Sequence, residues 1–257
     1  MKITVLCENV SHAPEIEAEH GLSLFVESEG RRILFDMGQT ELFARNANIL
    51  GVKLSQIDLA VLSHGHYDHG GGLESFLREN LTAPVYVHPK AFEAHFHGAE
   101  KYIGLASSLK ENERFVATDN VTELSEGITL HPASCVPRNN PSLPHGLTVE
   151  VNGQLVPDSF EHEQYMLIEE KGKRVLFSGC SHIGILNVAE HFRPQVLIGG
   201  FHTSKAEEAK LDEIAERLGK LQTVFYTCHC TGEKQFDYLS CRMHNIRYLS
   251  CGQVLTI

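Results

Sequence analysis

The sequence lacks any apolar run that approaches the roughly 18 residues of a membrane-crossing helix, so we expect no transmembrane segment and no membrane partner. It is also poor in basic residues, since 22 Lys and Arg stand against 33 Asp and Glu, a formal charge of −11. A nucleic-acid backbone is bound by a basic surface, so we expect no nucleic-acid partner, although a local basic pocket for a phosphate is still allowed. The first ten residues, MKITVLCENV, reach acidic residues too early for a signal peptide.

The number of cysteines is odd. The seven Cys, with Cys228 and Cys230 only two apart, fit free or metal-bound thiols in a reducing compartment better than a disulfide framework. We therefore expect a cytoplasmic protein. By contrast there are 16 His, and neutral imidazole is the commonest ligand for borderline metals. The 257 residues, 42% of them apolar, suffice for one large domain or two small ones, and we favour one.

The most informative stretch is SHGHYDHGGG, residues 63–72. It follows a short apolar run that predicts a buried strand opening into a loop. His64 and His66 are two apart in extended backbone and can bind one ion, while Asp68 and His69, carried round a Gly-rich turn, can reach a second. Imidazole and carboxylate donors suit Zn, Mn or Fe and are poor for Ca or Mg.

Alternating apolar runs predict a layered α/β chain. We expect strands at residues 1–6 (as an edge strand), 21–26, 31–35, 57–62, 84–88, 147–151, 165–168, 174–177, 195–198 and 223–226, and helices at 40–50, 73–77, 185–192 and 205–221.

The loop at residues 63–72 resembles the HxHxDH signature of the metallo-β-lactamase superfamily. The resemblance implies an α/β (α+β) fold, a four-layer αββα sandwich that forms one domain over residues 1–257. It also implies one or two divalent ions at the edge of the sheets, with zinc ahead of manganese or iron. Asp36, in the context LFDMG, corresponds to an Asp beneath the metal loop that would orient an imidazole. The alternative for Asp36 is an ordinary strand-end turn.

Three later apolar runs also end in potential ligands. Because function concentrates where strands end, we expect these endings to join the His64 loop in one site. The endings are Cys180-Ser181-His182, then Phe201-His202, then Cys228-His229-Cys230.

The resemblance suggests roles for these residues. The family strand that corresponds to residues 174–179 usually ends in Gly-Asp, and that Asp bridges two metals, whereas here Cys180 stands in its place. A thiolate can bridge because a bound metal removes its proton, but Cys180 is also open to binding one ion, lining the site or being a buried structural thiol. His229 corresponds to the final His ligand. His202 is open to metal contact or to substrate binding and proton transfer. Cys228 and Cys230 flank His229 and would point away from it in extended backbone, so we interpret them as core thiols or as thiols that support the ligands.

One family feature is missing. A His in a GHT or GHS turn usually precedes the Gly-Asp strand, and here the segment is FEHEQ, residues 160–164. His162 or Glu163 can fill that role, or His182 can replace it. We favour His182, because it needs no rearrangement of the loop.

Residues 90–146 are less regular, and we interpret them as a lid or substrate-facing insertion. Within it we assign His95 and His97 to a solvated helix face rather than to a metal. Arg138 is our candidate for an anionic group of the substrate, because a guanidinium binds phosphate or carboxylate in two places. The amino end of the helix at 185–192, beginning at Ser181, can bind a phosphate.

The strings GLSLFVE, SHGHYDHGGG, YIGL, FEHEQ, FSGCSHIGILN, GGFH and HCTG resemble, in this order, a branch labelled beta-lactamase superfamily II metal-dependent hydrolases. This branch is similar to the archaeal enzyme that joins a dihydropterin diphosphate to a ribofuranosyl-aminobenzene phosphate. We therefore expect a metal-dependent hydrolase or transferase acting on a phosphorylated small molecule, with that transferase activity as the alternative. Asp68 would accept the proton of a metal-activated water and His202 would protonate the leaving group. The expected metal ligands are His64, His66, Asp68, His69, His182, His229 and Cys180.

Two alternatives come from other classes of protein. A di-iron redox protein of the superfamily would bring a flavin domain or partner and carboxylate-rich ligands, neither of which the sequence shows. A non-catalytic, metal-stabilised binding protein would bind its ligand without turnover.

Overall fold

The computed structural model describes residues 1–143 and 146–257, and Pro144 and His145, inside the predicted insertion, lie outside the described residues. The chain divides into two compact units. The described residues of unit 1 are 1–119, 146–164 and 250–257, and those of unit 2 are 120–143 and 165–249. The single domain expected over residues 1–257 stays a prediction.

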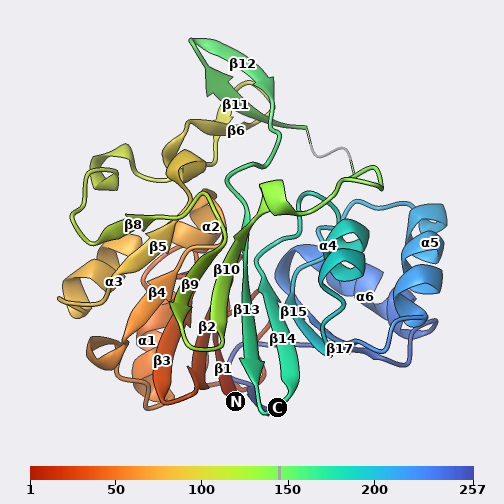
Figure 1. The fold of residues 1–257 in the computed structure, drawn as a ribbon, viewed down its shortest axis with the longest axis horizontal. Coiled ribbons are helices and arrows are strands. Elements are labelled where there is room, and N and C mark those ends of the chain that lie inside the picture. The colour runs from red at the N-terminus through yellow and green to blue at the C-terminus, as the bar shows by residue number, and fades with distance from the viewer. Residues whose placement is uncertain (144–145) are drawn as a thin grey trace. The chain divides into compact units, whose positions relative to one another are not determined.

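Within the described residues, unit 1 contains a seven-stranded mixed sheet in the order β18-β1-β2-β3-β4-β5-β8 (Figure 1). Strands β1 to β3 are antiparallel neighbours, and β3, β4, β5 and β8 run parallel. Because β1 lies between β18 and β2, the expected edge position of the first strand is wrong. The strands are β1 Lys2–Cys7, β2 Ser23–Ser28, β3 Arg31–Phe35, β4 Leu59–Val61, β5 Val85–Val87, β8 Phe115–Ala117 and β18 Val254–Thr256.

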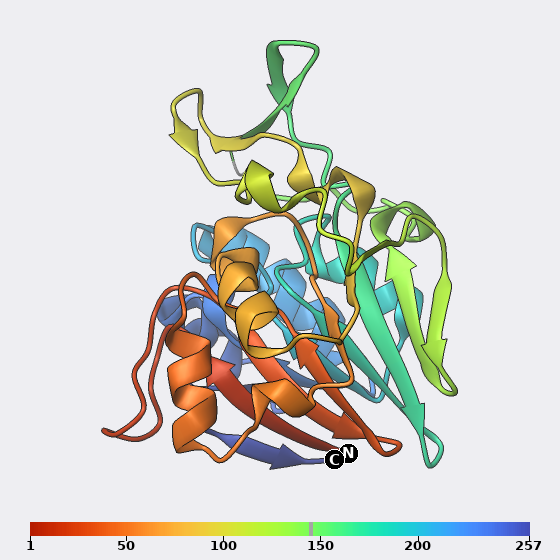
Figure 2. The same cartoon turned by 90° about the vertical axis from the view of Figure 1, so that its left-hand side faces the viewer.

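Helices pack against one face of this sheet, as Figure 2 shows in orange. The apolar core joins Phe43 of α1 and Phe76 of α3 to Leu34, Ala60 and Val85 of the strands. Burying one such aromatic side chain contributes about 1.5–3 kcal/mol. The helices of unit 1 are α1 Leu42–Ile49, α2 Tyr67–Gly70 and α3 Leu73–Glu79, with 3-10 turns η1 Leu54–Gln56, η2 Pro89–Phe92 and η3 Ser107–Leu109.

A second, four-stranded sheet of the described residues also belongs to unit 1, in the order β12-β11-β6-β7. Its β11–β12 hairpin stands clear of the seven-stranded sheet of unit 1 (Figure 2). His95 and His97 both lie in strand β6, so the expected helix face is wrong for both of them. His95 is fully buried, and only His97 is exposed as expected. The strands are β6 His95–His97, β7 Lys101–Tyr102, β11 Leu147–Val151 and β12 Gln154–Pro157.

Unit 2 contains its own seven-stranded sheet, counted over the part of the chain that is described, in the order β17-β16-β15-β14-β13-β10-β9. Strands β14 to β17 run parallel, and the helices α4 and α5 fall in the crossovers between them, as parallel pairing requires. The elements are β9 Thr122–Ser125, β10 Ile128–Pro132, η4 Ala133–Cys135, β13 Gln164–Glu170, β14 Lys173–Ser178, α4 Ile185–Phe192, β15 Val196–Gly199, α5 Glu208–Gly219, β16 Val224–Thr227, η5 His229–Thr231, α6 Glu233–Ser240 and β17 Ile246–Tyr248.

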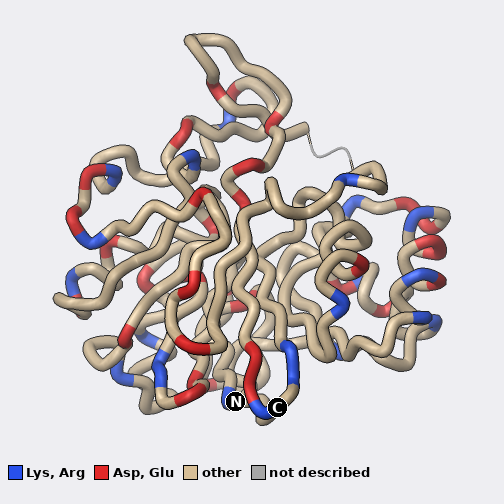
Figure 3. Tube along the Cα trace, viewed as in Figure 1, with Lys and Arg blue, Asp and Glu red and all other residues tan. Residues whose placement is uncertain are grey.

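Helix α5 shows why these segments are helical. Its apolar residues Leu211, Ile214 and Leu218 are buried at helical spacing, and charged residues of both signs cover the rest, as Figure 3 shows. Lys220 bonds Glu216 one turn earlier at 2.7 Å. No helix of the described residues is long and apolar enough to cross a membrane.

The structure confirms each expected strand and helix to within a few residues, and α4 spans the predicted 185–192. The interval 90–146 is more regular than expected, because β8 belongs to the large sheet of unit 1 and β9 and β10 belong to that of unit 2. Its irregular part is therefore shorter than the sequence suggested.

Candidate metal centre

Three buried imidazoles lie together at the carboxyl end of β4. His64, His66 and His69 are each at most 4% exposed. The ring of His64 lies 4.6 Å from that of His66 and 4.2 Å from that of His69, centroid to centroid. The expected Gly-rich turn is helical, since α2 begins at Tyr67 and carries Asp68 and His69.

Asp36 organises this loop from beneath. Its buried carboxylate accepts hydrogen bonds from His69 Nδ1, from the Ser63 amide and from the Ser63 hydroxyl, each at 2.7 Å. Since that hydroxyl gives its one proton to Asp36, it accepts a bond from His64 Nδ1 at 2.8 Å. Both rings therefore carry their proton on Nδ1 and leave the Nε2 lone pair for a metal. The expected orienting position of Asp36 matches this geometry.

The protonation state of the loop suits cation binding. Burial lowers the pKa of His64 and His66 well below the usual value, and neighbouring imidazoles lower it further. Burial also lowers the pKa of His69, but the charge and hydrogen bond of Asp36 outweigh it, so that this pKa is raised. His64 and His66 are thus neutral near pH 7 and need lose no proton to bind a metal.

Asp68 differs from the histidines in its access to solvent. Its side chain is 13% exposed, and Oδ2 lies 3.2 Å from Nε2 of the half-exposed His20. Its carbonyl accepts the Leu22 amide at 3.1 Å, which ties α2 to the segment before β2. The carboxylate therefore lies at the border between the buried imidazoles and water.

His162 supports the loop through its backbone. Its Nδ1 accepts the amide of Gly65 at 2.9 Å, so Nε2 carries the proton and donates to Asp158 Oδ2 at 3.2 Å. His95 Nδ1 donates to the same oxygen at 2.8 Å. The donor atoms of His66, His95, Asp158 and His162 lie within 4.8 Å of one another, but the hydrogen bonds to Gly65 and Asp158 already use both nitrogens of His162. The bond from the Gly65 amide to His162 therefore fixes the backbone between the two ligands His64 and His66.

Sequence reasoning missed Asp158 and misplaced His95. These two side chains are 63 residues apart in the chain, and neither falls in a recognisable motif. Burial raises the pKa of Asp158, but the bonds from His162 and His95 outweigh it, so that this pKa is lowered. The charged carboxylate of Asp158 therefore holds the rings of His95 and His162 in place. Only the tertiary structure reveals this contact.

The rest of the FEHEQ segment also contacts the metal loop and the residue before it. Gln164 donates its amide to the Ser63 carbonyl at 2.8 Å and its side chain to the Leu62 carbonyl at 2.8 Å. Glu163 is fully buried, and its charge is among those that raise the pKa of His69. Of the alternatives that the sequence left open, His162 binds the loop and Glu163 provides a buried carboxylate near it.

Unit 2 gathers the three later strand endings. Strands β14, β15 and β16 are parallel neighbours, so their carboxyl ends lie at one edge of the sheet. The donor atoms of Cys180, His182 and His202 lie within 4.8 Å of one another, and so do those of Cys180, His229 and Cys230. All but the partly exposed His202 are buried. Cys180 is common to both groups.

Backbone strain accompanies these ligand-bearing residues. Ser181, His202 and His229 have φ of 57°, 52° and 50°, a left-handed conformation that costs a residue with a side chain roughly 1–2 kcal/mol. Thr231 holds two of the loops together, because its hydroxyl accepts the Phe201 amide at 2.9 Å and its carbonyl accepts the Thr203 hydroxyl at 3.1 Å. Strain of this kind is concentrated at functional sites.

Two expectations about unit 2 are corrected. Cys230 does not point away from His229, because residues 229–231 form the 3-10 turn η5 instead of extended backbone. Ser181 does not begin the following helix, since α4 starts at Ile185 after Gly184. The buried hydroxyl of Ser181 bonds that of Ser178 at 2.7 Å.

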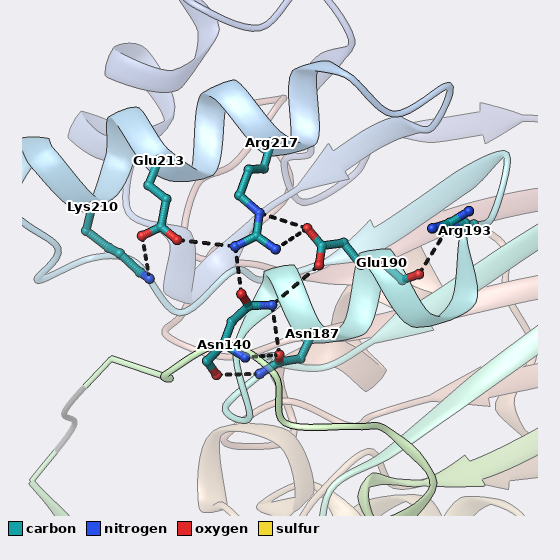
Figure 4. Close-up of polar contacts among 7 residues, drawn as sticks. All are labelled: Asn140, Asn187, Glu190, Arg193, Lys210, Glu213 and Arg217. Atoms are coloured by element: carbon teal, nitrogen blue, oxygen red, sulfur yellow. Dashed lines mark hydrogen bonds and ion pairs between the residues drawn. The ribbon is translucent and has the colours of Figure 1, made fainter.

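Arg138 is exposed in a turn fixed to the helices of unit 2. Two residues later, the Asn140 amide donates to Asn187 Oδ1 of α4 at 2.8 Å, and Asn140 Oδ1 accepts Arg217 Nη1 of α5 at 2.6 Å (Figure 4). Arg217 also bonds Glu190 of α4. The turn that carries the exposed Arg138 is therefore anchored to α4 and α5.

The donor chemistry fits a divalent transition metal in both units. Unit 1 brings together the predicted residues His64, His66, His69 and Asp36, with Asp68 on the same loop. Unit 2 brings together Cys180, His182, His202 and His229. Imidazole and thiolate are ligands for zinc or iron and are unsuited to calcium or magnesium.

Known proteins resemble this chain over most or all of its length. The sequence profile of the metallo-beta-lactamase superfamily matches residues 16–221. Among curated proteins of Methanocaldococcus jannaschii, the uncharacterised protein MJ0448 is 29% identical over 99% of this chain and 100% of its own. The 7,8-dihydropterin-6-methyl-4-(beta-D-ribofuranosyl)-aminobenzene-5'-phosphate synthase of that archaeon is 30% identical over 91% of this chain and 88% of its own.

A solved structure covers the whole chain as well. Tm1679, described as a metal-dependent hydrolase of the beta-lactamase superfamily, is 30% identical, with a TM-score of 0.87 over 100% of this chain and 99% of its own. This likeness confirms the expected mixed α/β fold class.

Proposed function

Because the chain belongs to the metallo-β-lactamase superfamily, we propose that it is a metal-dependent hydrolase or transferase that acts on a phosphorylated small molecule. The observation that carries this proposal is the fixed state of His64 and His69. Ser63 and Asp36 occupy their Nδ1 positions, so that each ring presents Nε2 as a ligand. The superfamily consists mostly of metal-dependent hydrolases and typically binds divalent metals.

The proposed ligands are His64, His66, Asp68 and His69 in unit 1, with His182, His229 and Cys180 in unit 2. Zinc is the proposed ion, with manganese or iron as alternatives, because imidazole, carboxylate and thiolate all bind zinc. A divalent ion in such a site supplies positive charge that lowers the pKa of water and stabilises charge that develops on a phosphate.

Separate residues of the chain carry out the proton transfers and bind the substrate. Asp68, which reaches both the imidazoles and solvent, accepts the proton of the attacking group. His202, partly exposed, donates a proton to the leaving group. Arg138 binds a phosphate or carboxylate of the substrate from its anchored turn.

A second candidate function is the transfer reaction of the archaeal relative. That protein is named as a synthase of a dihydropterin ribofuranosyl-aminobenzene phosphate, and 30% identity over 91% of this chain favours this activity. The same ligands would then bind a diphosphate leaving group instead of activating water.

The deciding experiment combines metal analysis of the purified protein with a screen of phosphodiesters, phosphomonoesters, lactones and pterin diphosphates. We expect metal-dependent turnover of a phosphorylated compound that is lost in Asp68→Ala while the metal is retained. Asp58→Ala is the matched control, because Asp58 pairs with Arg32 before β4. Full activity of Asp68→Ala would remove this carboxylate from the reaction.

Two results would replace the proposal with another class of function. Tight binding of a pterin or nucleotide without turnover, with or without metal, would identify a binding protein. Bound iron whose absorbance changes on reduction, without hydrolysis or transfer, would identify a redox protein.

We also propose a cytoplasmic location and a small-molecule partner. None of the seven cysteines, all of which are described, forms a disulfide, as is typical of a reducing compartment. The charge of −11 disfavours nucleic acid as the partner.

A further inference from the structure

Two thiols flank the last predicted histidine ligand in unit 2. Cys180 follows β14, and His229 and Cys230 follow β16, with β15 between these strands. The two sulfurs and a ring nitrogen of His229 all lie within 4.8 Å of one another. The three residues are at most 7% exposed. Neither thiol belongs to a disulfide, so both sulfurs can act as ligands.

The chain leaves space for the Cys230 side chain at the edge of the sheet. A Cβ at Gly200 would lie 2.2 Å from Cys230 Sγ, so residue 200 must be glycine for the thiol to reach its place. The Gly200 amide bonds the Gly179 carbonyl at 2.9 Å, and the Cys230 carbonyl accepts the Ser204 amide at 3.2 Å. These bonds fix the backbone on both sides of the sulfur.

The hydrogen bonding of the Cys230 side chain does not explain why a thiol would be needed here for a structural role alone. The one described hydrogen bond of its thiol is weak, since Sγ donates to the Cys180 carbonyl at 3.6 Å. The left-handed backbone at His229 costs free energy, and it is the turn that brings both His229 and Cys230 toward Cys180. A metal ion would use all three donors and repay that cost.

We propose that Cys230 is a metal ligand, and that Cys180, His229 and Cys230 together bind one ion through two sulfurs and one nitrogen. The proposal rests on the metal-binding part of the proposed function and specifies its donor set in unit 2. Zinc takes such ligands with Zn–S distances of about 2.3 Å and Zn–N distances of about 2.0–2.1 Å. Three protein ligands leave a fourth, open position, which is the composition of catalytic zinc sites.

The proposal has two chemical consequences. Both thiols lose their protons when the ion binds, so two protons pass to solvent for each ion bound at this site. Soft thiolates also select zinc or ferrous iron over manganese or magnesium. Manganese should therefore bind this site more weakly than zinc does.

The first test uses the unmodified full chain loaded with zinc. X-ray absorption at the zinc edge should show sulfur neighbours at about 2.3 Å beside nitrogen or oxygen neighbours at about 2.0–2.2 Å. A spectrum with nitrogen and oxygen neighbours alone would overturn the proposal. This measurement needs no variant, so it remains decisive if a substitution prevents folding.

The second test assigns the sulfurs. Cys230→Ser should weaken zinc binding about 10-fold or more, and in the cobalt-loaded protein it should reduce the thiolate-to-cobalt charge-transfer band. Cys241→Ser, which removes an exposed thiol elsewhere in unit 2, should change neither. An undiminished band and unchanged zinc affinity in Cys230→Ser would exclude Cys230 as a ligand.

The two proposals fail separately. Sulfur ligation in a protein that turns over no phosphorylated compound would sustain this inference and remove the proposed function. Turnover by a protein whose zinc has no sulfur neighbour would do the reverse.

Discussion

Asp36 and Ser63 decide which nitrogen of His64 and His69 is available to a metal. Both side chains are fully buried, so their bonds to the two rings do not compete with water. The same carboxylate also accepts the Ser63 amide, which couples the orientation of the rings to the path of the backbone. The ligands are thus oriented before any ion binds, which lowers the entropy lost on binding.

Asp36→Asn should therefore weaken metal binding. The substitution keeps the size of the side chain but removes the charge that holds the His69 Nδ1 proton, and loss of such orienting partners typically costs 10- to 100-fold in affinity. Competition with a chelator would measure the change. Asp58→Asn, at a partly exposed carboxylate paired with Arg32, should bind metal as the wild type does. Equal affinity of both variants would show that Asp36 does not orient the ring.

The metal-free protein should lose stability in acid because of His162. Burial lowers the pKa of His162 to about 4, the Asp158 bond opposes that shift and the charge of His95 adds to it. The unfolded chain takes up a proton here below about pH 6.5 and the folded chain only below about 4, so falling pH favours unfolding across this window. The loss is on the order of 3 kcal/mol by pH 4.

His162→Gln provides the comparison for this titration. A glutamine amide can accept from Gly65 and donate to Asp158 as the neutral imidazole does, but it takes up no proton. Denaturant unfolding between pH 7 and pH 4 should show a smaller loss of stability in the variant. Identical acid profiles would mean that His162 titrates normally in the folded protein.

At the scale of elements, the metal loop is fixed by close contact as well as by hydrogen bonds. A Cβ at Gly65 would lie 2.1 Å from the carbonyl oxygen of Ala91 in η2, so the loop and this turn are in direct backbone contact. The FEHEQ segment binds the loop through Gly65 and Ser63. The loop therefore depends on two segments that follow it in the chain.

Gly65→Ala should displace the loop and reduce both stability and metal content. Overpacking of this kind typically costs about 1–3 kcal/mol, which thermal unfolding and metal analysis would detect. Gly219→Ala is the control, because a Cβ there would meet only Met243 at 4.0 Å and alanine is favoured in a helix. Unchanged metal content in Gly65→Ala would show that the loop tolerates the shift.

At the scale of the whole molecule, potential ligands occur in both compact units. Unit 1 contributes imidazoles oriented by a buried carboxylate, and unit 2 contributes imidazoles and thiols at the carboxyl ends of three parallel strands. Ion binding should therefore stabilise segments of both units.

Chelation should lower the melting temperature and increase hydrogen exchange in both units. An ion that binds only the folded state at 100 times its dissociation constant adds about 2.7 kcal/mol of stability. The increase in exchange should be concentrated in residues 63–72 of unit 1 and 228–232 of unit 2. Exchange that rises in one unit alone would locate all bound metal there.

The sequence by itself determined the α/β class, the strand positions and most candidate ligands. Apolar periodicity is local, and HxHxDH places four donors within six residues, so both are visible without a fold. The ligand-bearing ends of β14, β15 and β16 were predictable for the same reason, since each follows its own apolar run.

Only the tertiary structure decided how His95, Asp158 and Cys230 are used. His95 meets Asp158 across 63 residues of chain, and burial and hydrogen bonding over that separation leave no local pattern. Cys230 turns toward Cys180 because residues 229–231 adopt a 3-10 turn with a left-handed residue, where extended backbone would have directed it away. Side-chain direction in a turn depends on backbone angles that the surrounding packing sets, so composition and spacing could not fix it.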